Sequence, residues 1–278
     1  MPLDLVLAVL FAALLHALWN SFVKVGADRT VSVLAIIATG GLLSLPVAAV
    51  LPPPPPLGWV YLLASVATHL IYYYFLINAY RFGDLSRVYP LARGLAPPLV
   101  ALGAAAAAGE WLSHREIAGV ALVSVGIGSL VLGGRGAADR RGLWFAAATG
   151  VMIAIYTVID GFGGRSAPQA LRYIAWLNVV EAAVFLAAAR WWRGPLLWPA
   201  LRATLPGGAV AGVLATLSYG IVIYAMSRGA MAHVSALRES SVVIAALIGT
   251  LWLGEPGALV RVGAASIVAA GVVVMHWR

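Results

Sequence analysis

The 278-residue chain has no cysteine, a single lysine and few charged residues of either sign. Without cysteine, disulfides, thiolate nucleophiles and cysteine-ligated metals are excluded. A nucleotide-binding P-loop needs a Gly-Lys pair, and Lys24 follows Val23, so ATP hydrolysis by this chain is excluded. The usual hydrolase and kinase motifs are also missing, and the five histidines have no metal-ligand spacing. We therefore expect no enzyme activity, no catalytic residue, no cofactor and no metal.

Charged residues make up 10% of the chain and hydrophobic residues 62%. An ordinary soluble domain has about 25% charged and about 45–50% apolar residues. A soluble fold of this size cannot bury so many apolar side chains and keep a wetted surface. The composition excludes a cytosolic enzyme and a disordered protein, and it indicates an all-α integral membrane protein. Most of the positive charges stand at the ends of apolar runs, which indicates membrane topology and not nucleic-acid binding.

Ten apolar runs are long enough to cross a bilayer as helices, which takes about 20 residues each. The runs are continuous and rich in Ala and Leu, without the alternation of a membrane barrel. Residues 52–56 are five prolines, which predict a stiff hairpin between the second and third spans. The predicted spans are Leu3–Lys24, Thr30–Leu51, Leu57–Tyr80, Leu85–Ala108, Arg115–Gly133, Gly142–Gly161, Gln169–Trp192, Thr204–Ser227, Ala232–Leu253 and Ala258–Trp277.

The positive charges divide unequally between the two ends of these spans. More of them fall on the side that carries Lys24 and the loop at 134–141 than on the other side. Cytoplasmic loops carry the excess of Lys and Arg, so we expect that side in the cytoplasm and both termini outside. The protein is expected in the cell (inner) membrane, in direct contact with the lipid bilayer.

The two halves of the sequence resemble each other. GDLSRVYPLAR at 83–93 is followed by GEW at 109–111, and GAMAHVSALR at 229–238 is followed by GEP at 254–256. The arginine that ends each first motif, Arg93 or Arg238, precedes the glutamate of the following Gly-Glu motif by the same number of residues. Five spans per half predict an inverted five-plus-five repeat, with one repeat at residues 1–134 and the other at 140–278. Such symmetry allows a central site to open to either side of the membrane.

These motifs, together with LLHALWNSFVK at 14–24, resemble the drug/metabolite transporter superfamily. Within it the chain is most similar to the bacterial ten-helix EamA type, which includes amino-acid exporters. The resemblance implies ten helices around a central cavity and transport by alternating access. Since no energy-converting domain is present, we expect a secondary transporter, for which a monomer is sufficient.

Five ionisable residues lie well inside the predicted spans: Arg93, Asp160, Glu181, Arg238 and Glu239. A charge at the centre of a bilayer costs about 2.5–3.5 kcal/mol on insertion scales, so each should face a cavity or a partner. The adjacent Arg238 and Glu239 diverge by about 100° and need different partners.

A proline pair follows Arg93 in the fourth span. Pro97 and Pro98 cannot donate to the carbonyls of Arg93 and Gly94, which predicts a kink in the helix with free carbonyl acceptors at membrane depth. Irregular backbone at that depth is typical of transporter sites.

Polar and aromatic residues that share helix faces complete the expected substrate site. We expect Arg93 or Arg238 to hold the carboxylate of an amino acid, Glu239 or Asp160 to meet its ammonium group, and tyrosines to contact its side chain. The candidate residues are His16, Trp19, Asn20, His69, Tyr73, Tyr89, Arg93, Tyr156, Asp160, Trp176, Tyr219, Ser235, Arg238 and Glu239.

Alternatives remain at this stage. The cargo could instead be a drug-like cation, a nucleotide sugar or another metabolite, although two buried arginines disfavour a cation. Transport could be uniport or proton-coupled, with the proton on Glu239, Asp160, Glu181 or a histidine. A membrane-embedded enzyme would need an acid–base or metal cluster, and a purely structural protein would not need paired buried charges.

Overall fold

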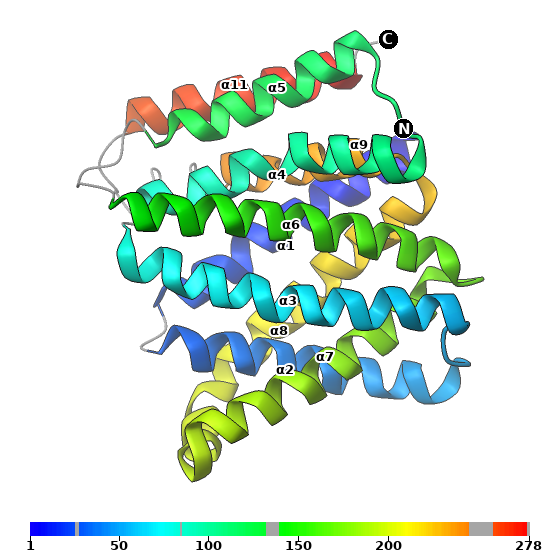
Figure 1. Cartoon of the computed structure of the whole chain (residues 1–278), viewed down its shortest axis with the longest axis vertical. Helices are drawn as coiled ribbons and strands as arrows, with labels where there is room; N and C mark the ends of the chain where they lie inside the picture. Colours follow the sequence, from blue (N-terminus) through cyan, green and yellow to red (C-terminus); the bar gives the residue numbers. More distant parts are fainter. Residues whose placement is uncertain (26–27, 84, 132–138, 245–257, 277–278) are drawn as a thin grey trace. The chain divides into compact units, whose positions relative to one another are not determined.

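The computed structural model describes residues 1–25, 28–83, 85–131, 139–244 and 258–276 (Figure 1). Across these ranges the chain is helical and contains no strand, which confirms the all-α prediction. The elements are α1 (Leu3–Val25), α2 (Arg29–Val50), α3 (Pro56–Phe82), α4 (Leu85–Ala108), α5 (His114–Ser129), α6 (Arg140–Ser166), α7 (Ala170–Arg193), the 3₁₀ turn η1 (Gly194–Leu196), α8 (Leu197–Arg228), α9 (Met231–Arg238) and α11 (Ala258–His276).

Most predicted spans end within a few residues of an observed helix, and α4 has the predicted bounds. The exceptions are α6, which continues to Ser166, α8, which already begins at Leu197, and the ninth span, whose helix α9 ends at Arg238. Among the described residues, six stretches are long and apolar enough to cross a membrane, the last of them formed by α7, η1 and α8 together. The chain is thus a multi-pass helical membrane protein. Glu255, Trp252, Trp277 and most of the loop at 134–141 lie outside the described residues.

Local chemistry explains where several helices begin. The Asp28 carboxylate accepts a hydrogen bond from the Val31 backbone at 3.1 Å and caps α2. Ser113 and Glu116 form a capping box at the start of α5. In the proline run, residues 52–55 are not helical and Pro56 opens α3, a position where its missing N–H is not needed.

The helices form two compact units, and each takes segments from both halves of the sequence. Unit 1 comprises residues 1–13, 67–159 and 229–278, and unit 2 comprises residues 14–66 and 160–228.

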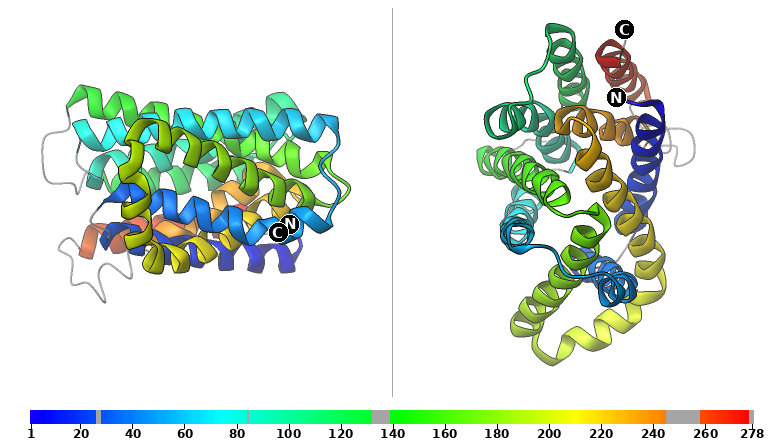
Figure 2. Two further views of the ribbon diagram at one scale, coloured as in Figure 1. Left: turned by 90° about the horizontal axis from the view of Figure 1, so that it is seen from below. Right: turned by 90° about the vertical axis from the view of Figure 1, so that its right-hand side faces the viewer.

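Unit 1 contains a close pair of helices, α5 and α11, which lie side by side (Figures 1 and 2). A Cβ atom on Gly119 of α5 would lie 2.7 Å from the Met275 Cβ of α11, so only glycine permits this approach. In unit 2, α2 packs against both α7 and α8, and a Cβ atom on Gly212 would lie 2.5 Å from Thr39 Cβ. Small residues at helix contacts are typical of membrane proteins.

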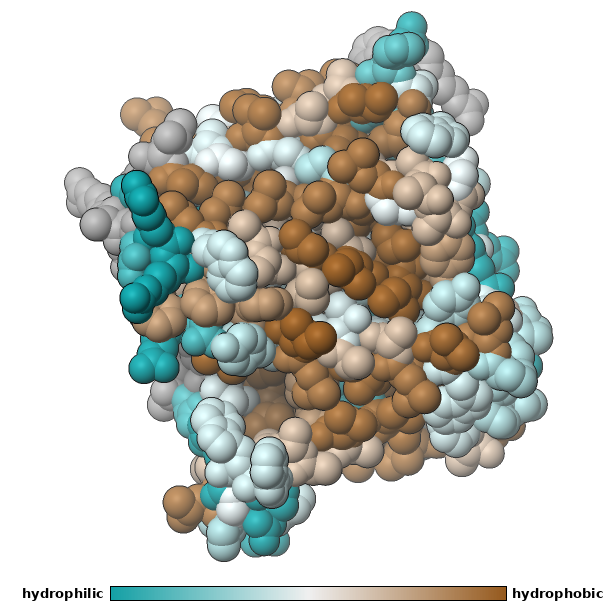
Figure 3. All heavy atoms as spheres, viewed as in Figure 1, coloured by the Kyte–Doolittle hydropathy of each residue, from teal (hydrophilic) through white to brown (hydrophobic). Residues whose placement is uncertain are grey.

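The outward faces are rich in large apolar side chains, among them Leu42, Leu63 and Leu102. On the face drawn in Figure 3, hydrophobic residues predominate along the helices and hydrophilic residues gather near the helix ends. Trp111 and Trp191 are 80% and 92% exposed, as expected of aromatic residues at a membrane interface. This distribution is typical of helices whose sides contact lipid and whose ends contact water.

The fourth predicted span is a single helix. α4 runs from Leu85 to Ala108, contains Pro90, Pro97 and Pro98, and contacts α5 and α9. The kink expected at Pro97 and Pro98 stays a prediction. The predicted ninth span is interrupted, because α9 ends at Arg238.

Candidate functional site

A buried ion pair joins α4 and α9 in unit 1. Arg93 Nη2 lies 2.8 Å from Glu239 Oε1, and the two residues are 5% and 2% exposed. Arg93 Nε and Glu239 Oε2 have no hydrogen-bond partner within the described part of the chain. Burying charged groups is costly unless their remaining donors and acceptors are satisfied. The pair therefore has both a donor, Arg93 Nε, and an acceptor, Glu239 Oε2, that no described residue satisfies.

The backbone around Glu239 departs from the α-helical pattern. The Glu239 N–H donates to the Ala236 carbonyl at 3.1 Å, and the Val242 N–H donates to the Glu239 carbonyl at 2.9 Å, both three residues back. Ser240 Oγ donates to the Leu237 carbonyl at 2.6 Å, which satisfies one carbonyl freed by the turn. Glu239 thus lies at a helix discontinuity, a feature that lines substrate sites in several transporter folds.

The other end of α9 is held by the segment between α4 and α5. Glu110 Oε2 accepts a hydrogen bond from the Met231 N–H, the first residue of α9, at 2.8 Å. His233 Nε2, two residues later, lies 2.7 Å from Glu116 Oε1. The glutamate of the first Gly-Glu motif is therefore a helix cap. Its counterpart in the second motif, Glu255, lies outside the described residues.

Aromatic side chains gather in the same unit. The rings of His69 and Tyr156 are 4.3 Å apart, and Tyr72 lies 5.6 Å from Tyr156 and 4.9 Å from Tyr73. His69 is buried and interacts electrostatically with Arg238.

Electrostatic interactions connect this aromatic group to the ion pair. Tyr89, one helical turn before Arg93, interacts with Arg93, Arg238, Glu239 and Tyr156. Arg238 and Glu239 have partly different partners, as their predicted divergence requires, because Glu239 meets Arg93 whereas Arg238 interacts with His69.

Unit 2 contains a different buried cluster, centred on Asp160 of α6, which is 0% exposed. The Tyr173 hydroxyl donates to Asp160 Oδ1 at 2.8 Å, and the Tyr219 hydroxyl donates to Asp160 Oδ2. Tyr173 also forms a hydrogen bond with Ser65 of α3, and Glu181 of α7 interacts electrostatically with Asp160. The cluster joins α3, α6, α7 and α8 through hydroxyl and carboxyl groups.

The first-span candidates also lie in unit 2. The rings of His16 and Trp19 meet edge to face at 5.1 Å, and the Asn20 amide donates to the His16 carbonyl at 2.7 Å within the same helix. One of the two N–H donors of the Asn20 amide is therefore used within its own helix.

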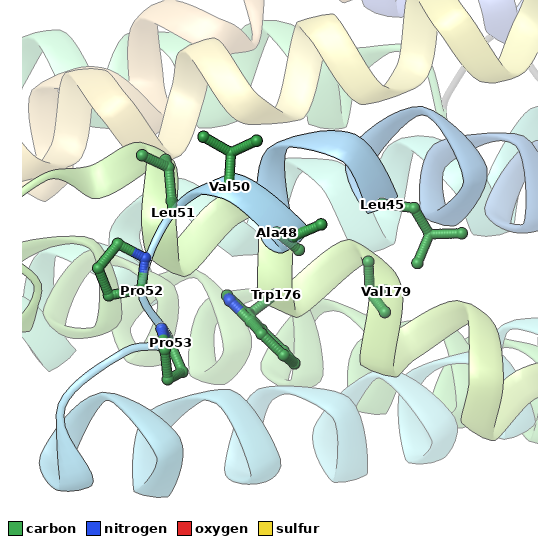
Figure 4. A pocket seen from close by; sticks show the side chains of 9 residues that line it. Leu45, Ala48, Val50, Leu51, Pro52, Pro53, Trp176 and Val179 are labelled. Carbon is green, nitrogen blue, oxygen red and sulfur yellow. The ribbon is translucent and has the colours of Figure 1, made fainter.

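Trp176 of α7 lines an open groove of about 540 Å³ at the end of α2 (Figure 4). The other lining residues are apolar, among them Leu45, Val50 and Pro52. This groove presents no charged group to a zwitterion. Trp176 packs edge to face on Trp59, with ring centroids 5.4 Å apart.

The structure brings together some of the sequence candidates and not others. His69, Tyr73, Tyr89, Arg93, Tyr156, Ser235, Arg238 and Glu239 belong to unit 1, whereas His16, Trp19, Asn20, Asp160, Trp176 and Tyr219 belong to unit 2. Tyr156 and Asp160, which share a helix face, join different clusters. The sequence candidates omitted Tyr72 and Tyr173. No sequence signal marks Tyr173, because its partner Asp160 lies on another helix.

Comparison with known proteins agrees with this architecture. Residues 140–277 match the EamA-like transporter family. A solved structure titled only "Crystal structure of protein" is similar in fold, with a TM-score of 0.78 and 21% sequence identity, over 99% of this chain and 98% of that chain. No curated protein matches the chain.

The fold defines a multi-pass helical membrane protein. Over residues 140–277 the chain belongs to the EamA-like transporter family, which confirms the resemblance to the drug/metabolite transporter superfamily. It is a membrane transporter of that type, from a family of transporters and not of enzymes.

Proposed function

We propose that this transporter exports amino acids, including aromatic ones, or closely related small zwitterions, and that it works by alternating access across the inner membrane. The observation that carries the proposal is the buried pair formed by Arg93 and Glu239. Arg93 Nε and Glu239 Oε2 have no hydrogen-bond partner among the described residues.

A free amino acid carries an acceptor for Arg93 Nε and a donor for Glu239 Oε2. Its carboxylate accepts hydrogen bonds from a guanidinium, and its ammonium group donates to a carboxylate. By entering between Arg93 and Glu239, a zwitterion replaces one ion pair with two. A cargo with a single positive charge would instead leave Arg93 without an anion. The proposal therefore favours a zwitterion over a drug-like cation.

The aromatic residues of unit 1 supply the remaining contacts. Tyr89 lies one turn from Arg93, and His69, Tyr72 and Tyr156 form the neighbouring group of rings. Aromatic faces attract an ammonium group and pack against planar apolar side chains. These rings favour amino acids with aromatic or large apolar side chains over glycine or alanine.

The discontinuity at Glu239 supports the alternating-access part of the proposal. The short helix α9 is capped by Glu110 at its start and ends where Glu239 meets Arg93. Substrate that separates Arg93 from Glu239 removes the contact at one end of α9 only. A change of a few backbone angles at the discontinuity can then tilt α9 against α4, as hinge motions do in other proteins.

Counterflow in proteoliposomes tests the proposal without any assumption about the energy source. Vesicles are loaded with one unlabelled amino acid, and entry of the same labelled amino acid is followed for a panel that contains Phe, Trp, Leu, Ala, Lys and Glu. We expect exchange of the aromatic and large apolar members. Arg93→Met and Glu239→Gln should abolish it, whereas Arg202→Met, at an exposed arginine of α8, should not. Exchange that survives in both site variants, or a panel without any exchanged amino acid, would refute the proposal.

A further inference from the structure

The apolar groove in unit 2 has no role in the zwitterion site just described. It lies between the end of α2 and the first turns of α7, and the proline segment forms part of its wall (Figure 4). Its volume of about 540 Å³ is typical of sites for small molecules. We propose that this groove binds an anionic phospholipid of the surrounding membrane, with the lipid phosphate at Arg172 and one acyl chain in the groove.

The two helices that form the groove pack closely at its inner end. The Asn178 amide of α7 donates to Ser44 Oγ of α2 at 3.0 Å, and a Cβ atom on Gly41 would clash with Ala182. From this contact towards the proline segment, the space between the helices is open. The groove is therefore closed towards the middle of the two helices and open at their ends, the level at which lipid headgroups lie in a membrane.

A positive charge is fixed at the open end of the groove. Arg172, in the first turn of α7, donates from Nε to the Pro52 carbonyl at 2.9 Å and from Nη2 to the Pro53 carbonyl at 2.6 Å. Both of these prolines line the groove. Arg172 forms no ion pair within the described part of the chain. Its guanidinium has further N–H donors, which are suited to the oxygens of a phosphate group.

The polarity of the groove changes along α7 from its open end inwards. Arg172, Trp176 and Val179 follow one another at helical spacing and share one face of the helix. The Trp176 indole nitrogen is buried without a hydrogen-bond partner among the described residues, and in Figure 4 it is turned towards the end of α2. A charge, a single N–H donor and an apolar surface thus succeed one another. A phospholipid presents its phosphate, its ester carbonyl and its acyl chain in the same order.

The length of the groove agrees with this order. From Arg172 to Val179 the helix rises about 10 Å, at about 1.5 Å per residue. This length accommodates the glycerol region and the first methylene groups of one chain. The rest of the chain can then follow the outward apolar face of α2, where Leu42 and Leu45 are exposed.

The same features disfavour other occupants of the groove. Inorganic phosphate makes no use of the apolar walls, and a diacylglycerol leaves the guanidinium without an anion. Phosphatidylcholine brings a second positive charge close to Arg172, whereas phosphatidylglycerol does not. Apolar burial and charge pairing therefore act together only for an anionic phospholipid.

Native mass spectrometry of the purified full-length protein in detergent tests the proposal without any transport assay. Phosphatidylglycerol is titrated first, and the comparison probes are phosphatidylcholine, a diacylglycerol with the same chains and inorganic phosphate. We expect one saturable site for phosphatidylglycerol, weaker binding of the other two lipids and no competition by inorganic phosphate.

Two kinds of variant separate the charge from the groove. Arg172→Met should weaken phosphatidylglycerol binding about tenfold and leave diacylglycerol binding unchanged, while Arg172→Lys keeps the charge and should lose less. Ala49→Phe places a ring in the groove and should weaken binding of both lipids. Arg202→Met and Ala187→Phe are matched controls at exposed positions outside the groove, and they should bind like the wild type.

Three outcomes would overturn the proposal. The first is equal phosphatidylglycerol binding by Ala49→Phe and Ala187→Phe, a comparison that holds even if Arg172→Met does not fold. The second is equal binding of phosphatidylglycerol and diacylglycerol, which would show apolar contact alone. The third is displacement of phosphatidylglycerol by inorganic phosphate, which would show a simple anion site. Because no amino acid takes part, failure of this proposal and failure of the proposed function are distinguishable.

Discussion

The two units bury their acids in different ways. In unit 1, Glu239 pairs with the Arg93 guanidinium. Arg93 Nε and Glu239 Oε2 have no hydrogen-bond partner among the described residues. In unit 2, the oxygens of Asp160 are both taken by tyrosine hydroxyls, and the second acid of the cluster is Glu181. The first arrangement leaves polar atoms for a ligand with two charges. In the second, both oxygens of the acid bind hydroxyl groups of the protein itself.

The largest effect on stability is expected in unit 1. Arg93→Met leaves Glu239 as a buried charge without its guanidinium, and loss of one partner of a buried ion pair costs about 3–5 kcal/mol. Denaturant titration of the purified protein in detergent measures this loss.

A double variant sharpens this first prediction. Arg93→Met combined with Glu239→Met removes both charges and should be less destabilised than Arg93→Met alone, whereas the exposed control Arg202→Met should change stability by no more than about 0.5 kcal/mol. A single variant as stable as the control would show that the two charges are not paired.

A smaller effect is expected in unit 2. Tyr173→Phe removes one of the two hydroxyls bound to Asp160, and a hydrogen bond to a charged group contributes about 1.5–3 kcal/mol. The measurement is the same denaturant titration, with Tyr74→Phe at an exposed tyrosine as the control. If the two phenylalanine variants are equally stable, the hydroxyl does not support the carboxylate.

The start of α9 gives a third and smaller effect. Glu110→Ala removes the acceptor of the Met231 N–H, and loss of a helix cap costs about 0.5–2 kcal/mol. Because the cap fixes one end of the helix that leads to Glu239, hydrogen exchange at the α9 amides should accelerate more than at the α5 amides. Equal protection in the variant and the wild type would mean that Glu110 does not anchor α9.

The smallest effect concerns an ion pair outside both clusters. Burial raises the pKa of Asp28, but its hydrogen bond with Arg193, at 2.9 Å, and those with the α2 backbone outweigh burial and leave the pKa below its usual value of 3.8. Its stabilising contribution is therefore complete above that value and is lost as the pH falls through the lowered pKa. An exposed pair contributes at most about 1 kcal/mol. Asp28→Asn should lower the thermal midpoint slightly at pH 7 and not at pH 2, and equal midpoint shifts at both would contradict the pair.

Sequence reasoning predicted the helices better than the contacts between them. The apolar runs give the helix positions because bilayer thickness fixes the length of a span. Arg93, Asp160 and Glu239 were identifiable as site candidates because a charge inside a span is costly. Which acid would meet Arg93 was not predictable, because helix spacing says nothing about residues on distant segments.

Two features of the site escaped prediction for physical reasons. The break after Arg238 has no proline or glycine to announce it, whereas α4 contains three prolines and continues as one helix. Tyr173 looked like an ordinary aromatic residue, since a tyrosine has no insertion cost that would single it out. Its role depends on Asp160 of the preceding helix.

Equilibrium binding of one labelled amino acid, chosen from the counterflow panel, tests most directly which of the two buried acids, Glu239 or Asp160, holds the substrate. Purified wild type, Glu239→Gln and Asp160→Asn would be compared at one pH in detergent. The account predicts that Glu239→Gln loses binding and that Asp160→Asn retains it. Loss of binding in Asp160→Asn together with retention in Glu239→Gln would contradict the account.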